Sequence, residues 1–367
     1  MPNRHSANEY EELMRLIMQK GLLKKQPRRY ACKILLLWIM LGWGLIFLAL
    51  TSSLFLHMLD AAFLAFIFGQ IGFIGHDAGH QQIFQAGWKN RAMCLVHGNL
   101  VLGVSSAWWI KSHNQHHRFP NRSDLDPAVD FSVIAFSEHQ ARRRQFLQKF
   151  MINYQAYFFF PLLCLGPVGM RIDSIEFLLR KKAKHPLIEA LLLAAHFTLY
   201  FGLLLYCLGF PRMLLFAAVH QALFGLYMGS TFAPNHKGML MLSGESRMDF
   251  LREQVLTTRN VRGHPVTDFW CGGLNYQIEH HLFPSMPRNR LRAAQKIVRE
   301  FCRAHSVPYY ETGLLQSYRE ILKHLHKVSA VSRERQTTNP VARLQGGLDE
   351  SPAKRRSTRE EHGGAWG

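Results

Sequence analysis

Residues 108–117 read "WWIKSHNQHH", so His113, His116 and His117 fall within five consecutive positions. On a helix, positions i, i+3 and i+4 share one face, and the three imidazoles therefore point in the same direction. Two further stretches repeat this spacing. They are His76-Asp-Ala-Gly-His80 and Gln277-Ile-Glu-His280-His281. Three helical faces that present imidazoles can close around metal.

The seven imidazoles of these clusters are too many for one zinc ion, which takes four ligands. Of the six cysteines, only Cys271 lies near a cluster, which argues against a structural zinc site. A nitrogen-rich ligand set suits a pair of first-row transition ions, and iron is the choice for redox chemistry. A solvated histidine patch or a pH sensor is the alternative interpretation.

Long uncharged segments surround the clusters, and a membrane span needs about 20 apolar residues. The sequence predicts spans at about residues 34–56, 59–76, 188–209 and 212–234, in two helical hairpins. We expect the first turn around His57 to Asp60 and the second at "GFPR", with Pro211 at the turn.

Two other uncharged windows, residues 92–110 and 151–170, contain polar residues and prolines. If the histidine clusters share one side of a membrane, an even number of spans must separate them. Residues 92–110 then do not cross, and residues 151–170 lie along the interface or dip and return. Four spans result.

The basic residues indicate how these spans are oriented. The net charge is +19, and the basic residues concentrate in the first 33 residues and in "ARRRQ" and "RKKAK" between the hairpins. By the positive-inside rule, the histidine clusters and both termini are cytoplasmic. The predicted domains are a cytoplasmic N-terminal segment (1–33), a catalytic domain (34–328) and a disordered polar tail (329–367).

The order HxxxH, HxxHH, QxxHH around two hydrophobic hairpins resembles the membrane-bound fatty acid desaturase family. The most specific stretch is "DFWCGGLNYQIEHHLFPSMP" at 268–287, in which Gln277 replaces the first histidine of the third box, as in front-end acyl desaturases. The similarity covers about residues 36–290. The expected fold is an all-α membrane protein with four transmembrane helices in two hairpins and a cytoplasmic helical cap that holds a di-iron site.

The resemblance implies a non-haem centre of two iron ions that splits dioxygen and removes two hydrogens from an acyl chain. Its implied ligands are His76, His80, His113, His116, His117, His236, His280 and His281, with Gln277 near or on iron. His236 follows the fourth predicted span, and its alternative role is that of an interfacial residue beside Lys237.

Other residues near the boxes are candidates for supporting roles. Carboxylates can orient imidazole ligands, an asparagine can hold a bridging water, and tryptophans can line an acyl tunnel. The candidates are Asp77, Asp126, Glu279, Asn235, Trp108 and Trp109. The alternatives are ordinary helix-surface or capping carboxylates and an interfacial aromatic belt.

The leading hypothesis is a fatty acid desaturase that introduces a cis double bond into an acyl-lipid or acyl-CoA. A lipid hydroxylase or ketolase on the same site is the nearest rival, followed by a non-catalytic metal-binding membrane protein. Many front-end members contain a fused haem domain with an HPGG motif, which this sequence lacks. We therefore expect a separate electron donor, a ferredoxin or a cytochrome with its reductase. A bacterial plasma membrane is favoured over the endoplasmic reticulum.

Overall fold

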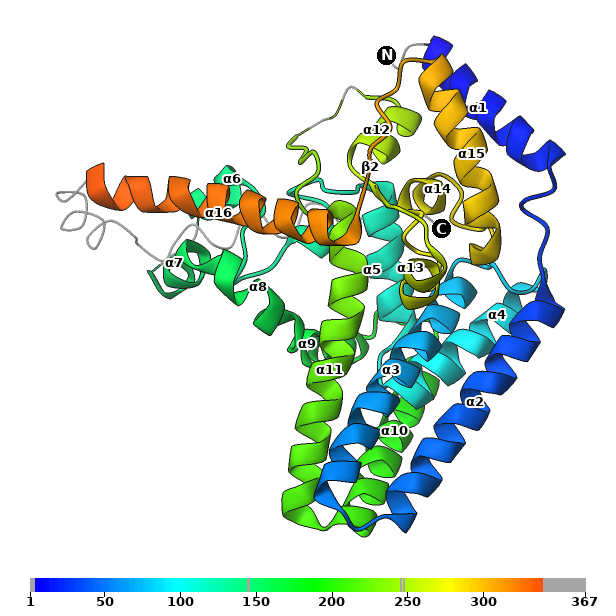
Figure 1. The fold of residues 1–367 in the computed structure, drawn as a ribbon, viewed down its shortest axis with the longest axis vertical. Helices are drawn as coiled ribbons and strands as arrows, with labels where there is room; N and C mark the ends of the chain where they lie inside the picture. The colour runs from blue at the N-terminus through cyan, green and yellow to red at the C-terminus, as the bar shows by residue number, and fades with distance from the viewer. Residues whose placement is uncertain (1–3, 144–145, 245, 247, 339–367) are drawn as a thin grey trace.

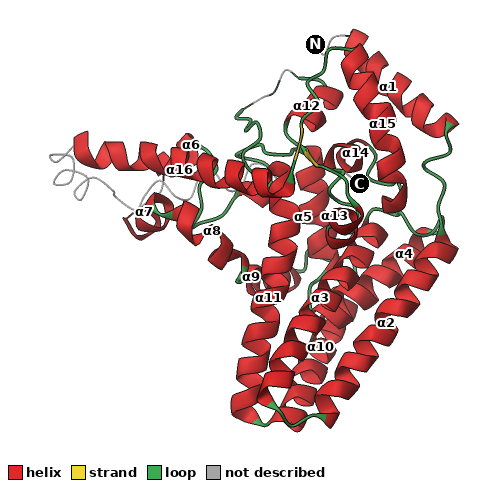
Figure 2. Cartoon of the chain, viewed as in Figure 1, coloured by secondary structure: helices red, strands yellow, loops and turns green. Residues whose placement is uncertain are grey.

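The computed structural model describes residues 4–143, 146–244, 246 and 248–338, and these residues are almost entirely helical (Figure 2). The only sheet among these residues is a parallel pair of two-residue strands. The elements are α1 (Arg4–Gln19), α2 (Pro27–Leu50), α3 (Leu54–Gly79), α4 (Gly87–Cys94), the π-helix η1 (Leu95–Leu102), α5 (Ser106–Arg118), the 3₁₀ helix η2 (Pro127–Val129), α6 (Glu138–Arg143), α7 (Phe146–Asn153), α8 (Gln155–Leu163), α9 (Gly166–Leu179), α10 (Pro186–Leu208), α11 (Phe210–His236), α12 (Phe250–Leu256), β1 (Asn260–Val261), α13 (Pro265–Trp270), α14 (Gln277–Leu282), α15 (Arg288–Ala304), β2 (Glu311–Thr312) and α16 (Leu314–Thr338).

Four helices are long and apolar enough to cross a membrane, namely α2, α3, α10 and α11. They lie side by side and form the lower part of Figure 1, with the remaining helices gathered at one end. Large apolar side chains cover the outer faces of α2 and α10, such as Leu50 (82% exposed) and Leu199 (64% exposed). An apolar surface of this extent is typical of helices in contact with lipid.

The turns differ in detail from the sequence prediction. Residues 51–53 join α2 to α3, so the turn expected at His57 to Asp60 is wrong, and both of these side chains are buried within α3. The polar stretch Thr51-Ser52-Ser53 ends α2 because these residues favour helix caps over helix interiors. The second turn is Gly209, with a φ of 70°, and Pro211 lies in the first turn of α11 rather than in the turn itself.

The first long helix also begins earlier than predicted, at Pro27 rather than near residue 34. Proline is favoured in the first turn of a helix, and basic residues follow it before the apolar part of α2. The N-terminal segment is itself structured, since α1 buries Leu13 and Ile17 against the helices α12 and α15.

The two ambiguous windows form no long straight helix. The segment from α4 through η1 is bent by 109° relative to α5 at Gly103, whose φ of 70° suits glycine. Residues 151–170 are divided among α7, α8 and α9.

The bend is held by a buried polar network rather than by apolar packing alone. The carboxylate of Glu189 on α10 accepts hydrogen bonds from Oγ of Ser105 (2.5 Å) and Nδ2 of Asn99 (3.1 Å). Ser105 is the N-cap of α5 and Asn99 lies in η1, so this network ties both sides of the bend to α10.

The predicted start of the disordered tail at residue 329 is wrong, because α16 continues to Thr338. Its side chains pack on the middle segment of the chain, where Oγ of Ser329 donates to the carbonyl of Ile152 at 2.7 Å. This long-range contact stabilises a polar helix that local composition does not reveal. Residues 339–367 of the predicted tail lie outside the described residues.

Candidate metal centre

Four helices meet at the end of the long apolar helices where the remaining helices gather. The first box lies at the end of α3, the second is the last turn of α5, the third is α14, and His236 is the last residue of α11. Each helix presents its histidines on one face, as the i, i+3, i+4 spacing predicts. Boxes separated by about 200 residues in sequence therefore share one site.

The imidazoles form two groups. In each group the possible ligand nitrogens lie within 4.8 Å of one another. The first group is His76, His80, His113 and His280; the second is His116, His236 and His281.

His117 belongs to neither group and lies between them. Its ring stacks on His281 at 4.2 Å, and its Nε2 is 3.1 Å from Nε2 of His113. The eight predicted imidazole rings thus lie in one place, and seven of them are divided between the two groups.

Several imidazole nitrogens in this site are buried and have no hydrogen-bond partner, which is costly unless another ligand satisfies them. They are Nε2 of His80, Nδ1 of His117, Nδ1 of His236, both nitrogens of His280, and Nε2 of His281. Lone pairs on neutral imidazoles are what first-row transition metals bind, so this donor set fits two metal ions.

The environment also favours the neutral form that binds metal. Burial, together with neighbouring histidines, holds the pKa of His80, His113, His117, His280 and His281 well below the usual value. These rings are therefore ready to coordinate at neutral pH without first losing a proton.

Two of the predicted supporting carboxylates contact box histidines. Asp77 lies 3.2 Å from Nδ1 of His76, and Asp126 accepts from Nδ1 of His116 at 2.9 Å. Burial raises the pKa of Asp126, but His116 and Lys237 outweigh this effect and leave it below its usual value. Both carboxylates can fix the ring orientation and tautomer, which leaves Nε2 directed inward.

Gln277 reaches the second group. Its Nε2 lies 3.0 Å from Nε2 of His236, and its Oε1 is 3.4 Å from Nδ2 of Asn235. Asn235 also donates to the carbonyl of Leu274 at 3.1 Å. The contacts of Asn235 therefore position Gln277, and the bridging water proposed for it stays a prediction.

Glu279 does not contact any box histidine among the described residues, contrary to its predicted role. It accepts from Nδ2 of Asn260 (2.7 Å) and from the hydroxyl of Tyr309 (2.7 Å). Burial raises the pKa of this carboxyl to about 7. The reason lies in the tertiary fold, because Asn260 and Tyr309 supply the hydrogen-bond partners of this carboxylate.

The two predicted tryptophans differ in their contacts with the box histidines. Trp109 stacks on His113 with a centroid distance of 4.4 Å and covers Gly79, where a Cβ would meet its ring at 2.5 Å. Trp108 is half-buried and has no ring contact with a box histidine in the described part of the chain. Only Trp109 thus borders the histidine cluster directly.

Three contacting residues were not predicted from the sequence. Gln254 accepts from Nδ1 of His281 at 2.9 Å, Arg288 pairs with Asp77, and the hydroxyl of Tyr30 donates to Asp77 at 2.8 Å. No local spacing marks these residues, although Arg288 directly follows the "LFPSMP" that closes the third box.

Comparison with known proteins agrees with this geometry. The sequence model of the family described as fatty acid desaturase matches residues 53–313. The chain belongs to the fatty acid desaturase family, and the predicted enzyme class is confirmed at this level. With four long apolar helices, the chain is a membrane protein of this family.

Curated relatives include three that span plants and animals. An acyl-lipid (9-3)-desaturase of Physcomitrium patens is 28% identical, over 92% of this chain and 66% of its own length. A Delta(8)-fatty-acid desaturase of Arabidopsis thaliana is 30% identical, over 80% of this chain and 68% of its own length. A Delta(6)-fatty-acid desaturase of Caenorhabditis elegans is 28% identical, over 74% of this chain and 65% of its own length. The chain therefore spans about two thirds of these relatives.

Proposed function

We propose that this protein is an O₂-dependent desaturase that holds two iron ions between its histidine boxes. The observation that supports this most is the set of buried imidazole nitrogens without partners, which converge in two groups. When bound, the iron ions supply the reduction of dioxygen and the removal of two hydrogens from a methylene pair that no acid or base could deprotonate.

The proposed ligands of the first ion are His76, His80, His113 and His280, and those of the second are His116, His236 and His281. His117 lies between the groups and is within reach of both. Gln277 contacts His236 and completes the second set of ligands, near or on iron. Asp77 and Asp126 hold their histidines in a single tautomer, while Asn235 supports Gln277.

The substrate that we propose is an acyl chain attached to a lipid, and the product contains a new cis double bond near the carboxyl end. The name acyl-lipid (9-3)-desaturase favours a lipid over acyl-CoA as the carrier. The name Delta(6)-fatty-acid desaturase favours a double bond near the carboxyl end. The ring of Trp109, against His113, is suited to packing along a methylene chain and to excluding water.

We further propose that α2 with α3, and α10 with α11, form two transmembrane hairpins. The histidine boxes then lie on the cytoplasmic side with both termini, a topology that the distribution of basic residues supports. A separate soluble or membrane-bound electron donor can reach the cap from that side.

Expression in a host without polyunsaturated lipids, followed by mass analysis of its fatty acids, tests the activity. We expect a product two hydrogens lighter than its precursor in the wild type, and none with His280→Ala. His139→Ala, which removes an exposed histidine, is the matched control and keeps the product. A product that has gained one oxygen would contradict desaturation and favour the hydroxylase alternative.

A further inference from the structure

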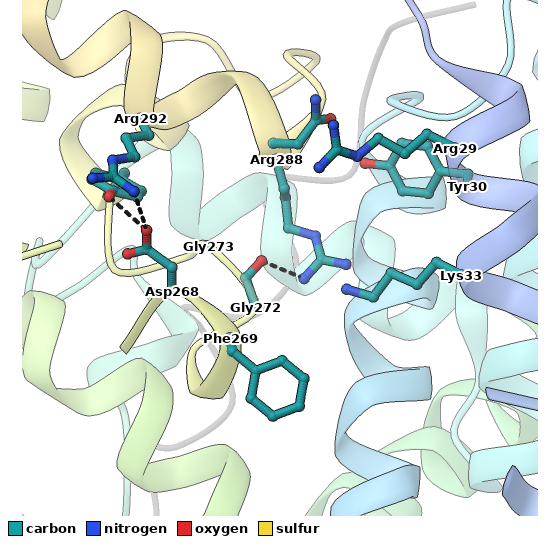
Figure 3. Close-up of a pocket in the computed structure, with 11 residues that line it drawn as sticks. Arg29, Tyr30, Lys33, Asp268, Phe269, Gly272, Gly273, Arg288 and Arg292 are labelled. Carbon is teal, nitrogen blue, oxygen red and sulfur yellow. Dashed lines mark hydrogen bonds and ion pairs between the residues drawn. The ribbon is translucent and has the colours of Figure 1, made fainter. Parts of the chain in front are cut away.

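A cavity of about 370 Å³ opens beside the metal centre, between the start of α2, the residues after α13 and the start of α15 (Figure 3). Four of its lining side chains are basic, namely Arg29, Lys33, Arg288 and Arg292. Such a concentration of positive charge requires an explanation, because like charges in a shared cavity repel one another.

Only part of this charge is neutralised by the protein. Arg288 uses Nε for Asp77 and donates from Nη1 to the carbonyl of Gly272 at 2.6 Å. Arg292 lies 3.6 Å from Asp268.

Arg29 and Lys33 have no carboxylate partner among the described residues. The amine of Lys33 points toward the guanidinium of Arg288 in Figure 3. An anion between them would remove this repulsion.

The backbone around the cavity also favours an anion. Both α2 and α15 begin here, with Pro27 and Arg288 as their first residues. The residues that precede them, Gln26 and Pro287, form no side-chain capping hydrogen bond. The positive ends of two helix dipoles add to the basic side chains, a combination with which proteins commonly bind phosphate.

The cavity lies at the end of the long apolar helix α2, where lipid headgroups are expected if this helix spans a membrane. The neighbouring helix α13 exposes Val266 (66%), Phe269 (62%) and Trp270 (40%). Its last two carbonyls accept from Gln70 (3.3 Å) and Tyr227 (2.6 Å), which belong to the long helices α3 and α11. An apolar surface beside basic residues at the end of a span is typical of a membrane interface.

From these observations we infer that this cavity binds the phosphate ester of the acyl substrate's head. A concave cavity of this size admits one phosphate-bearing group more readily than the broad surface of an acidic protein. The inference rests on the proposed function in one respect, namely that the bound molecule is the substrate of the desaturase.

The position of the cavity fits this role. Arg288 links it to the metal centre, because the same guanidinium pairs with Asp77, which contacts His76. A headgroup at Arg288 would place the carboxyl end of the acyl chain near the histidine boxes. The proposed double bond near that end requires the head to be close to the metal.

Phosphate binding can be measured without turnover by native mass spectrometry of the full chain in neutral detergent. The probes are phosphatidylglycerol, uncharged diacylglycerol, coenzyme A and inorganic phosphate. The test variant is Arg29→Ala/Lys33→Ala. The matched control is Lys24→Ala/Arg28→Ala, which removes the same charge from the same helix end but outside this cavity. Iron content is measured in parallel.

We expect the affinity for phosphatidylglycerol to fall about tenfold in the test variant and to change little in the control, since hydrogen bonds to charged groups are lost only there. Diacylglycerol should bind weakly to all three proteins. If the same selective loss is seen for coenzyme A and not for the lipid, the phosphate belongs to an acyl-CoA.

An equal loss in both variants, or no loss in either, would overturn the phosphate site. The phosphate site would also be overturned if the test variant bound phosphate normally but was reduced more slowly by an acidic electron-donor protein. Because iron content is recorded separately, a chain without iron would refute the proposed function while leaving the lipid result interpretable.

Discussion

Nδ1 of His116 donates to the carboxylate of Asp126 at 2.9 Å, and Nε2 of the same ring lies 3.4 Å from Nε2 of His236. Asp126 therefore holds one side of the imidazole, and the other side is directed at the neighbouring imidazole of His236. The carboxylate selects the tautomer whose Nε2 lone pair is free to bind metal.

Replacement of Asp126 by asparagine should remove this selection. We expect iron affinity or activity to fall by about 10- to 100-fold, as for other outer partners of metal-bound histidine. Titration of iron into the metal-free protein measures the affinity. Asp124→Asn changes an exposed carboxylate two positions away and should bind iron like the wild type. Equal iron affinity in the two variants would show that Asp126 does not orient His116 for metal binding.

Gln254 should matter in the same way for the second group. Its Oε1 accepts from His281, and its Nε2 donates to the carbonyl of His117 at 3.0 Å. In Gln254→Leu we expect the iron bound per chain to decrease after gel filtration, because His281 loses the partner that orients it. Gln19→Leu, on the exposed end of α1, is the control. Full iron retention by Gln254→Leu would show that the contact is incidental.

Gly79→Ala tests the contact between the first box and Trp109. A Cβ at this position would lie 2.5 Å from Cζ3 of Trp109, and the indole must move away from His113. Product formation in cells should fall by about tenfold or more, since small displacements in a site of this kind are costly. Gly202→Ala has open space around its Cβ and should keep full activity. Normal activity of Gly79→Ala would exclude a role for the position of Trp109.

The buried pair of Arg288 and Asp77 gives a prediction about stability. Arg288→Met leaves the carboxylate of Asp77 buried without its cation, and such a loss typically costs about 3–5 kcal/mol. The melting temperature in detergent should decrease clearly. The double variant Asp77→Asn/Arg288→Met should recover part of this loss, because no unpaired charge remains. If Arg288→Met were as stable as the wild type, the buried ion pair of Arg288 and Asp77 would not stabilise the fold.

The sequence predicted the parts of this protein that depend on local spacing. The boxes were found because i, i+3 and i+4 share a helical face, and Asp77 was found because it adjoins His76. Gln254, Tyr30 and Arg288 were missed because they contact the site only through the tertiary fold. Adjacency also misled, since Glu279 next to His280 faces Asn260 and Tyr309 instead.

The helix boundaries show the same division between local and long-range effects. The long apolar segments predicted four helices, but the turn before α3 was placed too late, since apolar composition alone does not mark caps. The end of α16 was missed because its polar residues are stabilised by distant partners such as Ile152 and Asn153. Composition predicts where a chain is apolar, whereas packing decides where a polar helix persists.

The proposed metal centre is tested most simply by the iron content of the purified protein, measured by elemental analysis for the wild type and for one variant in each histidine group. We predict two iron ions per wild-type chain, and a loss of iron in both His280→Ala and His236→Ala but not in His139→Ala. Purified protein that retains no stoichiometric iron after iron-replete expression, or iron that survives both substitutions, would contradict this prediction.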